Sequence, residues 1–288
     1  MKPDLLVAGS IALDALEGPY GRVSDELGGS ALYFALAASL ITPVQVVAPV
    51  GADAQEQVER LLRGRPVDSG GLRVLDAPTY RWSARDVGGR NRDLGNRDSI
   101  YDAWTPAPPA GFTGWAFAGS MRPDRQLQAL EGLRDCQLLA ADAMLSYATA
   151  QPAFLAGILG AVGWFFCNRL EFAALGGADP DEFRRQWGLE GLVLKDGPHG
   201  VTAYAAAGPE RVDAVAGRPV VDTTGAGDTL AGGLLARWRV TGGRPEGLRD
   251  ALRWGVACAS LAIEDVGLRA IARATAAALA ERVLEVAA

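Results

Sequence analysis

The chain has 288 residues, of which 49% are hydrophobic, and its 28 basic and 34 acidic side chains give a net charge of −6. This composition is typical of a globular protein and too apolar for a disordered one. The net negative charge argues against general nucleic-acid binding, which needs a basic face, although a site for a small anion can still be locally positive. An apolar run such as residues 31–41 is too short to span a membrane. Because residues 1–4 lead into a strand-like segment without the apolar core of a signal peptide, we expect a cytoplasmic protein.

The residue counts nearly exclude several enzyme chemistries. The chain has one histidine, His199, and three widely separated cysteines, which leaves no pair of zinc ligands at the usual spacing. A Ser-His-Asp or Cys-His mechanism would depend on His199, which lies in a Gly-Pro-His-Gly turn sequence. Lysine occurs only at positions 2 and 195, so the location of Lys195 is of interest.

The first 65 residues alternate between strand and helix patterns. Residues 4–9 and 44–50 are short apolar runs, typical of buried strands. Residues 31–41 are rich in Ala and Leu and predict a buried helix, and residues 52–63 predict an amphipathic helix. This alternation indicates a parallel sheet flanked by helices.

Residues 79–104 break this pattern. They are polar, arginine-rich and strand-prone at both ends, with Gly-Gly and Gly-Asn turn signals, so we expect a β excursion away from the main sheet. A proline-rich linker, residues 105–114, follows. We expect further strands at residues 115–118, 137–141, 164–167 and 192–195, and helices at 123–134, 150–161, from 169, 181–187, 226–239, 247–263 and 275–286. This order predicts an α/β fold with a doubly wound, mostly parallel sheet and a small β lid.

The segment most informative about chemistry is Asp222–Asp228, with the sequence Asp-Thr-Thr-Gly-Ala-Gly-Asp. We expect a β run to end at Asp222 and a helix to begin at about Ala226 or Gly227. The first N–H groups of a helix lack internal partners and carry partial positive charge, and glycines let the backbone turn them onto an anion. A carboxylate at Asp228 would repel a phosphate, but it could accept the proton of a hydroxyl that attacks that phosphate.

A structural interpretation of the same segment stays open, in which Asp228 only caps the helix and the glycines only form a turn. Two other phosphate-binding motifs fail on spacing. The chain contains no Gly-x4-Gly-Lys-Ser/Thr sequence, and Leu230 stands where the dinucleotide-binding fingerprint requires glycine or alanine.

Residues 222–228 resemble the C-terminal signature of the ribokinase-like, or PfkB, family of carbohydrate and nucleoside kinases. Other segments resemble family motifs in the same order along the chain, namely residues 9–14 ending in Asp14, the di-glycine of residues 28–31, Asn168-x-x-Glu171, and the turn of residues 194–200. The resemblance spans residues 4–267. It implies a single ribokinase-like domain over residues 1–288, with lid elements near residues 10–25 and 79–104.

The resemblance also implies a catalytic and nucleotide-binding set. Asp228 would be the catalytic base, and the backbone of residues 224–227, including Gly225, Ala226 and Gly227, would form the anion hole. Glu171 would order Mg²⁺ through water, and Asp222 with Thr224 would be the place for a monovalent cation such as K⁺. The residues implied near the ATP phosphates are Asn168, Lys195, Gly197, Gly200, Thr223 and Thr224.

For the acceptor, the resemblance implies that Asp14 binds sugar-like hydroxyls, since a carboxylate can accept from two of them. Gly28 and Gly29 would let the substrate approach the backbone. Tyr33 lies in the region where ribokinases carry an asparagine, and it would offer an aromatic wall and one hydroxyl instead of an amide. This departure weakens the case for ribose and leaves room for a nucleoside, an inositol-like polyol or another sugar.

Structural alternatives are open for these residues as well. Asp14 could cap a turn before Gly18-Pro19, Asn168 and Glu171 could form a helix capping box, Lys195 could be a solvated charge at a strand end, and Tyr33 could pack within its helix. In the lid, one or two arginines could clamp a phosphorylated substrate. The interleaved aspartates favour a solvated mixed-charge face or a dimer contact instead. The lid arginines are Arg81, Arg85, Arg90, Arg92 and Arg97.

The sequence thus predicts a kinase that uses ATP and Mg²⁺ and transfers the γ-phosphoryl group to a hydroxyl of a sugar or sugar-like polyol. A nucleoside kinase is the alternative enzyme, with Tyr33, Trp82 and Trp104 as candidate stacking residues. A non-catalytic ligand sensor is the alternative from another class. We expect small molecules, and neither nucleic acids nor membranes, as partners, with a homodimer through the lid as an option.

Overall fold

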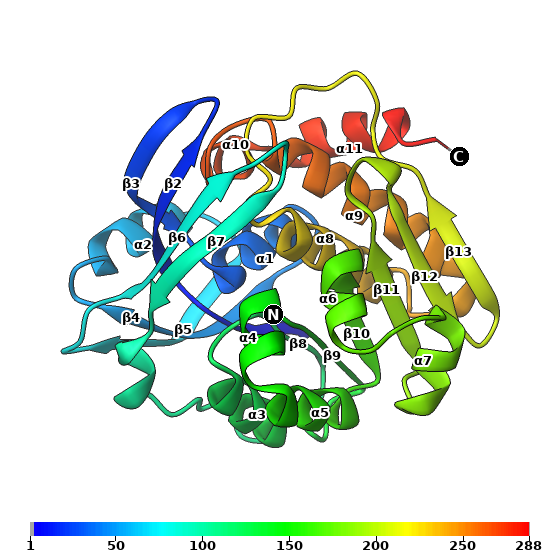
Figure 1. Ribbon diagram of the computed structural model, residues 1–288, viewed down its shortest axis with the longest axis horizontal. Helices are drawn as coiled ribbons and strands as arrows, with labels where there is room; N and C mark the ends of the chain where they lie inside the picture. The colour runs from blue at the N-terminus through cyan, green and yellow to red at the C-terminus, as the bar shows by residue number, and fades with distance from the viewer. Residues whose placement is uncertain (1–2, 288) are drawn as a thin grey trace.

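Nine strands form the large sheet of this computed structural model, which describes residues 3–287 (Figure 1). Their order is β13-β12-β11-β10-β9-β8-β1-β4-β5. Neighbours run parallel from β5 to β11, whereas β12 and β13 are antiparallel additions. The strands are β1 Leu5–Ala8, β4 Val44–Gly51, β5 Val67–Leu75, β8 Trp115–Ala118, β9 Leu138–Asp142, β10 Trp164–Asn168, β11 Gly191–Lys195, β12 Val201–Ala205 and β13 Gly208–Val212.

Helices cover both faces of this sheet because its strands are apolar on both sides. In β1, Leu5 and Val7 pack with α1, α8 and α9, and Leu6 and Ala8 pack with α3 and α5. The helices are α1 Ser30–Ser39, α2 Gln55–Leu62, α3 Pro123–Gly132, α4 Leu145–Ala150, α5 Pro152–Ala161, α6 Arg169–Ala174, α7 Pro180–Gln186, α8 Ala226–Val240, α9 Leu248–Ala262, α10 Arg269–Arg273 and α11 Ala276–Glu285. Within residues 3–287, no helix has both the length and the apolar character to cross a bilayer.

Four strands form a second, smaller sheet in the order β3-β2-β6-β7, which we call the small sheet. They are β2 Ala12–Gly18, β3 Gly21–Gly28, β6 Tyr80–Asp86 and β7 Asn91–Arg97. β2 pairs with β6 in parallel, and the other two pairs are antiparallel. Its inner face carries buried residues such as Leu16 and Ala84, which pack against Val266. This sheet contains the expected β excursion, and Figure 1 shows it standing apart from the large sheet.

The α/β architecture with a mostly parallel sheet is as the sequence predicts, but one expected strand is wrong. Residues 213–225 contain no strand, and Val220 is 60% exposed. The N–H groups of Val221 and Asp222 both donate to the carbonyl oxygen of Ile263 (2.8 and 3.4 Å) at the end of α9. The segment before Asp222 is therefore held by a helix end and not by a strand partner.

Candidate active site

The turn before α8 has the geometry of an anion cradle. Gly225 is the N-cap residue with a φ of 69°, in the left-handed region that favours glycine. A side chain here would overlap the ring of Tyr33, which packs against the turn. The Thr229 N–H donates to the Gly225 carbonyl (2.9 Å), whereas the Gly227 N–H has no backbone acceptor among residues 3–287. We define residues 222–228 as the cradle.

Asp222 holds the cradle in shape. One of its carboxylate oxygens accepts from the N–H (3.0 Å) and hydroxyl (2.7 Å) of Thr224, and the other accepts from the N–H of Gly267 (2.9 Å). The residue is only 2% exposed. A monovalent cation at Asp222 would therefore share its oxygens with three hydrogen bonds, and this cation stays a prediction.

Four charged groups meet at the start of α8: Asp142, Glu171, Lys195 and Asp228. The Lys195 ammonium lies 2.7 Å from the point where a Cβ on Gly227 would stand. Burial raises the pKa of Asp228 to about 6, against the lowering effect of Lys195. Burial would lower the pKa of Lys195, but Glu171, Asp142 and Asp228 raise it. Lys195 thus lies partly buried beside carboxyl groups, which differs from the solvated strand-end charge of the structural alternative. Its contact with nucleotide phosphates stays a prediction.

Sequence reasoning missed Asp142, the last residue of β9. Oδ1 of Asp142 and Oδ1 of Asp228 are both buried without a hydrogen-bond partner among residues 3–287. Burial and then the nearby Asp228 raise the pKa of Asp142 well above its usual value. Two such carboxyl groups require a proton or a cation between them. An acidic residue that ends an apolar strand was the available signal.

The predicted nucleotide-side residues adopt compact turns. Asn168 Oδ1 accepts from the N–H groups of Leu170 and Glu171 (both 2.9 Å), and Glu171 Oε2 accepts from the Asn168 N–H (2.7 Å). This is the capping box of α6 that the structural alternative anticipates. Gly197 and Gly200 lie at the two ends of the turn between β11 and β12, and Gly200 has a φ of 87°. A role for Asn168, Glu171 or this turn toward ATP stays a prediction.

Asp14 lies on the inner face of the small sheet and is 2% exposed. It pairs with Glu26 of β3 and Trp82 of β6, and its Oδ1 has no hydrogen-bond partner within the described part of the chain. Burial and the carboxyl groups of Asp222, Glu26 and Asp228 raise its pKa well above the usual value. A side chain at Gly28 would overlap the Asp14 carboxylate. The missing side chain at Gly28 therefore leaves room for the Asp14 carboxylate, and the approach of a substrate to Gly28 and Gly29 stays a prediction.

Tyr33 connects the two halves of the site. It is 1% exposed, and its hydroxyl has no hydrogen-bond partner in residues 3–287. Burial raises its pKa well above the usual value, and the negative charges of Asp14, Asp222 and Asp228 raise it further. The ring packs against Gly225 of the cradle and not only within its own helix, while the hydroxyl lies near the carboxyl groups of both halves. Gly29, the N-cap residue of α1, has a φ of 97°.

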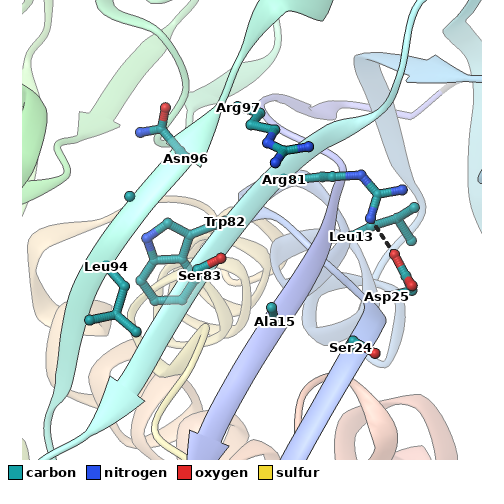
Figure 2. Close-up of a pocket in the computed structure, with 11 residues that line it drawn as sticks. Leu13, Ala15, Ser24, Asp25, Arg81, Trp82, Ser83, Leu94, Asn96 and Arg97 are labelled. Atoms are coloured by element: carbon teal, nitrogen blue, oxygen red, sulfur yellow. Dashed lines mark hydrogen bonds and ion pairs between the residues drawn. The ribbon is translucent and has the colours of Figure 1, made fainter.

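The outer face of the small sheet is a separate feature. It carries a hollow of 410 Å³. Figure 2 shows the side chains that line this hollow, with Arg81 reaching Asp25. Asp14 does not line this hollow, because successive residues of a strand face opposite sides. Arg81 pairs with Asp25 and Asp53, and Arg85 pairs with Glu17. These two arginines do not clamp a substrate at Asp14, and the mixed-charge interpretation holds for them.

Comparison with known proteins identifies the family of the chain. Residues 17–275 match the pfkB family carbohydrate kinase domain. The chain belongs to the pfkB family. It is 27% identical over 266 residues to a cytidine kinase of Thermococcus kodakarensis. The aligned residues cover 88% of this chain and 93% of the relative.

Solved structures of the ribokinase family share the fold. A nucleoside kinase of Methanocaldococcus jannaschii superposes with a TM-score of 0.78 at 19% identity, covering 98% of both chains. A nucleoside kinase of Burkholderia thailandensis in complex with inosine gives a TM-score of 0.80 at 21% identity, covering 97% of this chain and 96% of that one. As a member of the pfkB family, the protein is a phosphotransferase that acts on a hydroxyl acceptor.

Proposed function

We propose that this pfkB-family protein is an ATP- and Mg²⁺-dependent nucleoside kinase. The observation that carries the proposal is a pair of buried carboxylates on separate elements. Asp228 lies at the start of α8 and Asp14 on the small sheet, and each has an oxygen without a partner among residues 3–287. One can accept a proton at the cradle while the other binds hydroxyls of the same acceptor.

Asp228 would accept the proton of the attacking hydroxyl. Its pKa of about 6 keeps most of it ionised at neutral pH, yet close enough to the operating pH for efficient proton transfer. The backbone N–H groups that follow Gly225 would stabilise charge on the transferring phosphoryl group, since the turn already holds them in place. Lys195, above Gly227, would add positive charge on the same side.

The donor set at α8 suits Mg²⁺ bound mainly through water and phosphate oxygens. Asp142, Glu171 and Asp228 bring three carboxyl groups against the single ammonium of Lys195. Within residues 3–287, no group of three or more His, Cys, Asp or Glu residues forms a direct metal cage. Mg²⁺ commonly keeps several waters, so Asp142 and Glu171 would hold it indirectly. When bound with ATP, the ion would neutralise charge on the phosphates.

The acceptor-side residues favour a nucleoside. The Asp14 carboxylate can accept from two neighbouring hydroxyls such as those of a ribose. Trp82, beside Asp14 in register, has a buried Nε1 without a partner in residues 3–287, and Tyr33 has its unpaired hydroxyl. An indole and a phenol offer both an aromatic surface and polar contacts to a base. The cytidine and nucleoside kinases among the relatives support the same choice.

A sugar or polyol is the second candidate, because Asp14 would bind any pair of adjacent hydroxyls. The sensor alternative is not retained, since the chain belongs to a kinase family and Asp228 is present. A K⁺ site at Asp222, a homodimer through the small sheet and the cytoplasmic location stay predictions. So does the single domain over residues 1–288.

The test is a panel of nucleosides, sugars and polyols with ATP and Mg²⁺, read by ADP release and by the phosphorylated product. We expect at least one nucleoside to give the highest kcat/KM. Asp228→Asn should lower kcat by about 10²- to 10⁴-fold because the general base is lost. Asp135→Asn, at an exposed position in a loop, is the matched control and should leave kcat unchanged.

The outcomes separate the candidates. A sugar or polyol as the best acceptor would replace the nucleoside assignment but keep the roles of Asp14 and Asp228. An Asp228→Asn enzyme with more than a tenth of the normal kcat would overturn the role of Asp228 as base.

A further inference from the structure

One side chain of the small sheet reaches the cradle directly. Asn91 is the first residue of β7, just after the turn that joins it to β6. Its side-chain amide Nδ2 donates to the hydroxyl oxygen of Thr224 at 2.6 Å, across 133 positions of sequence. In Figure 1 the β6–β7 turn points toward the part of the molecule that contains the segment before α8.

The direction of this hydrogen bond is fixed by the cradle. The Thr224 hydroxyl donates its proton to Asp222 (2.7 Å), so its oxygen is left to accept. Asp222 in turn accepts from the N–H of Gly267 (2.9 Å). Asn91 therefore ends a chain of hydrogen bonds through Thr224 and Asp222, and only a donor at position 91 can complete it.

Other contacts hold the small sheet to the same part of the molecule without touching the cradle. Glu26 of β3 accepts from two nitrogens of Arg269 on α10 (3.0 and 2.6 Å). Leu16 and Ala84 pack against Val266. The small sheet thus has both a general attachment, through Arg269 and Val266, and a separate contact with Thr224.

We propose that Asn91 is a positioning residue that completes the anion cradle when the small sheet lies over the acceptor. By holding the Thr224 hydroxyl, it fixes the turn that presents the N–H groups of α8 to the transferring phosphoryl group. The cradle is then fully ordered only when the small sheet also excludes water from the acceptor. This inference rests on the proposed kinase function and adds a residue that couples closure to phosphoryl transfer.

Three variants test the contact in the full-length protein. Asn91→Ala removes the side chain, Asn91→Asp keeps its shape but loses the donor, and Thr224→Val removes the acceptor. The two Asn91 variants should lower kcat about three- to tenfold, as expected for one lost hydrogen bond. Thr224→Val should lower it at least as much, because it also removes the hydroxyl that donates to Asp222. Each should also raise the share of phosphoryl groups passed to water, measured as inorganic phosphate per phosphorylated acceptor. The Asn91→Ala/Thr224→Val double variant should lose no more than the larger single effect.

Arg269→Gln is the matched control, because it loosens the small sheet without touching Thr224. We expect it to change the acceptor KM by about twofold or less, as for an exposed ion pair, with the ratio of phosphate to product unchanged. If Arg269→Gln raises that ratio as much as Asn91→Ala, Asn91 only holds the sheet and the inference is overturned. The inference would also be overturned if Asn91→Asp kept the wild-type ratio of inorganic phosphate to product. Fully additive losses of kcat in the double variant would overturn it as well.

Amide hydrogen exchange of the cradle gives a readout that needs no turnover. We expect faster exchange of residues 224–228 in Asn91→Ala than in Arg269→Gln, at equal thermal stability of the two variants. Equal exchange in both would contradict the proposal. If the wild-type protein phosphorylates no acceptor, the proposed function fails, and the exchange comparison still decides the role of Asn91.

Discussion

The cradle and the inner face of the small sheet differ in how their buried polar groups are hydrogen-bonded. In the cradle, Asp222 accepts three hydrogen bonds from the protein itself, and Gly225 fixes the turn. On the small sheet, Asp14 Oδ1 and Trp82 Nε1 are buried without partners among residues 3–287. A preorganised turn suits the phosphoryl group, which is the same in every reaction cycle. Buried polar atoms without protein partners suit an acceptor molecule that supplies the missing hydrogen bonds. Cradle variants should therefore mainly lower kcat, and inner-face variants should mainly raise the acceptor KM.

Among variants that keep the catalytic carboxylate, the largest effect should come from Gly225→Ala. The new methyl group would overlap the Tyr33 ring in a turn whose φ is 69°, so the N–H groups of α8 would move. We expect kcat to fall about 100-fold, comparable to the loss of an oxyanion donor, and the free energy of unfolding to fall by about 1–3 kcal/mol. Gly217→Ala is the control, because Gly217 has a φ of 73° with no atom within 4 Å of a Cβ. Equal losses of kcat in both variants would contradict a special role for this turn.

The pH dependence of kcat/KM probes the cradle carboxylate. Asp228 must be ionised to accept a proton, and burial raises its pKa to about 6. Activity should therefore be constant from pH 8 down to about 7 and then fall about tenfold per pH unit below 6. Initial rates at saturating ATP and low acceptor measure this limb. An acid limb near pH 4 would mean that burial does not raise the pKa of the catalytic carboxyl.

The smallest effect should come from Tyr33→Phe, which tests the acceptor half of the comparison. The ring still packs against Gly225, but the buried hydroxyl without a partner is removed. We expect the KM of the best acceptor to rise about three- to tenfold, as for one lost hydrogen bond, with kcat changed less. Steady-state kinetics against acceptor concentration check this. A loss in kcat at unchanged KM would place the Tyr33 hydroxyl with the cradle.

The sequence was informative where structure is set by near neighbours. Gly225 and the helix start at Ala226 belong to one continuous segment, so the cradle could be predicted from spacing and from the resemblance of residues 222–228 to the family signature. Asp142 and Asn91 were missed because their roles depend on which strands lie side by side. The expected strand before Asp222 was wrong for a related reason, since Val220 and Val221 have the composition of a strand but no strand partner.

The register of the strands also shows which side of the small sheet Arg81 faces. Arg81 pairs with Leu13 across the sheet, and Asp14 pairs with Trp82, so Arg81 and Asp14 face opposite sides. A composition rich in arginine could not distinguish these faces. The β5 strand was not expected either, because it contains two glycines and exposed polar residues where a buried strand would be apolar.

The surroundings of Lys195 have a practical consequence for its chemical reactivity. Lys195 is held as an ammonium among Glu171, Asp142 and Asp228, and an ammonium ion is a poor nucleophile toward acylating reagents. Amine-selective acylating reagents should therefore modify Lys195 slowly while the carboxyl groups of the site surround it, and faster once the protein is unfolded.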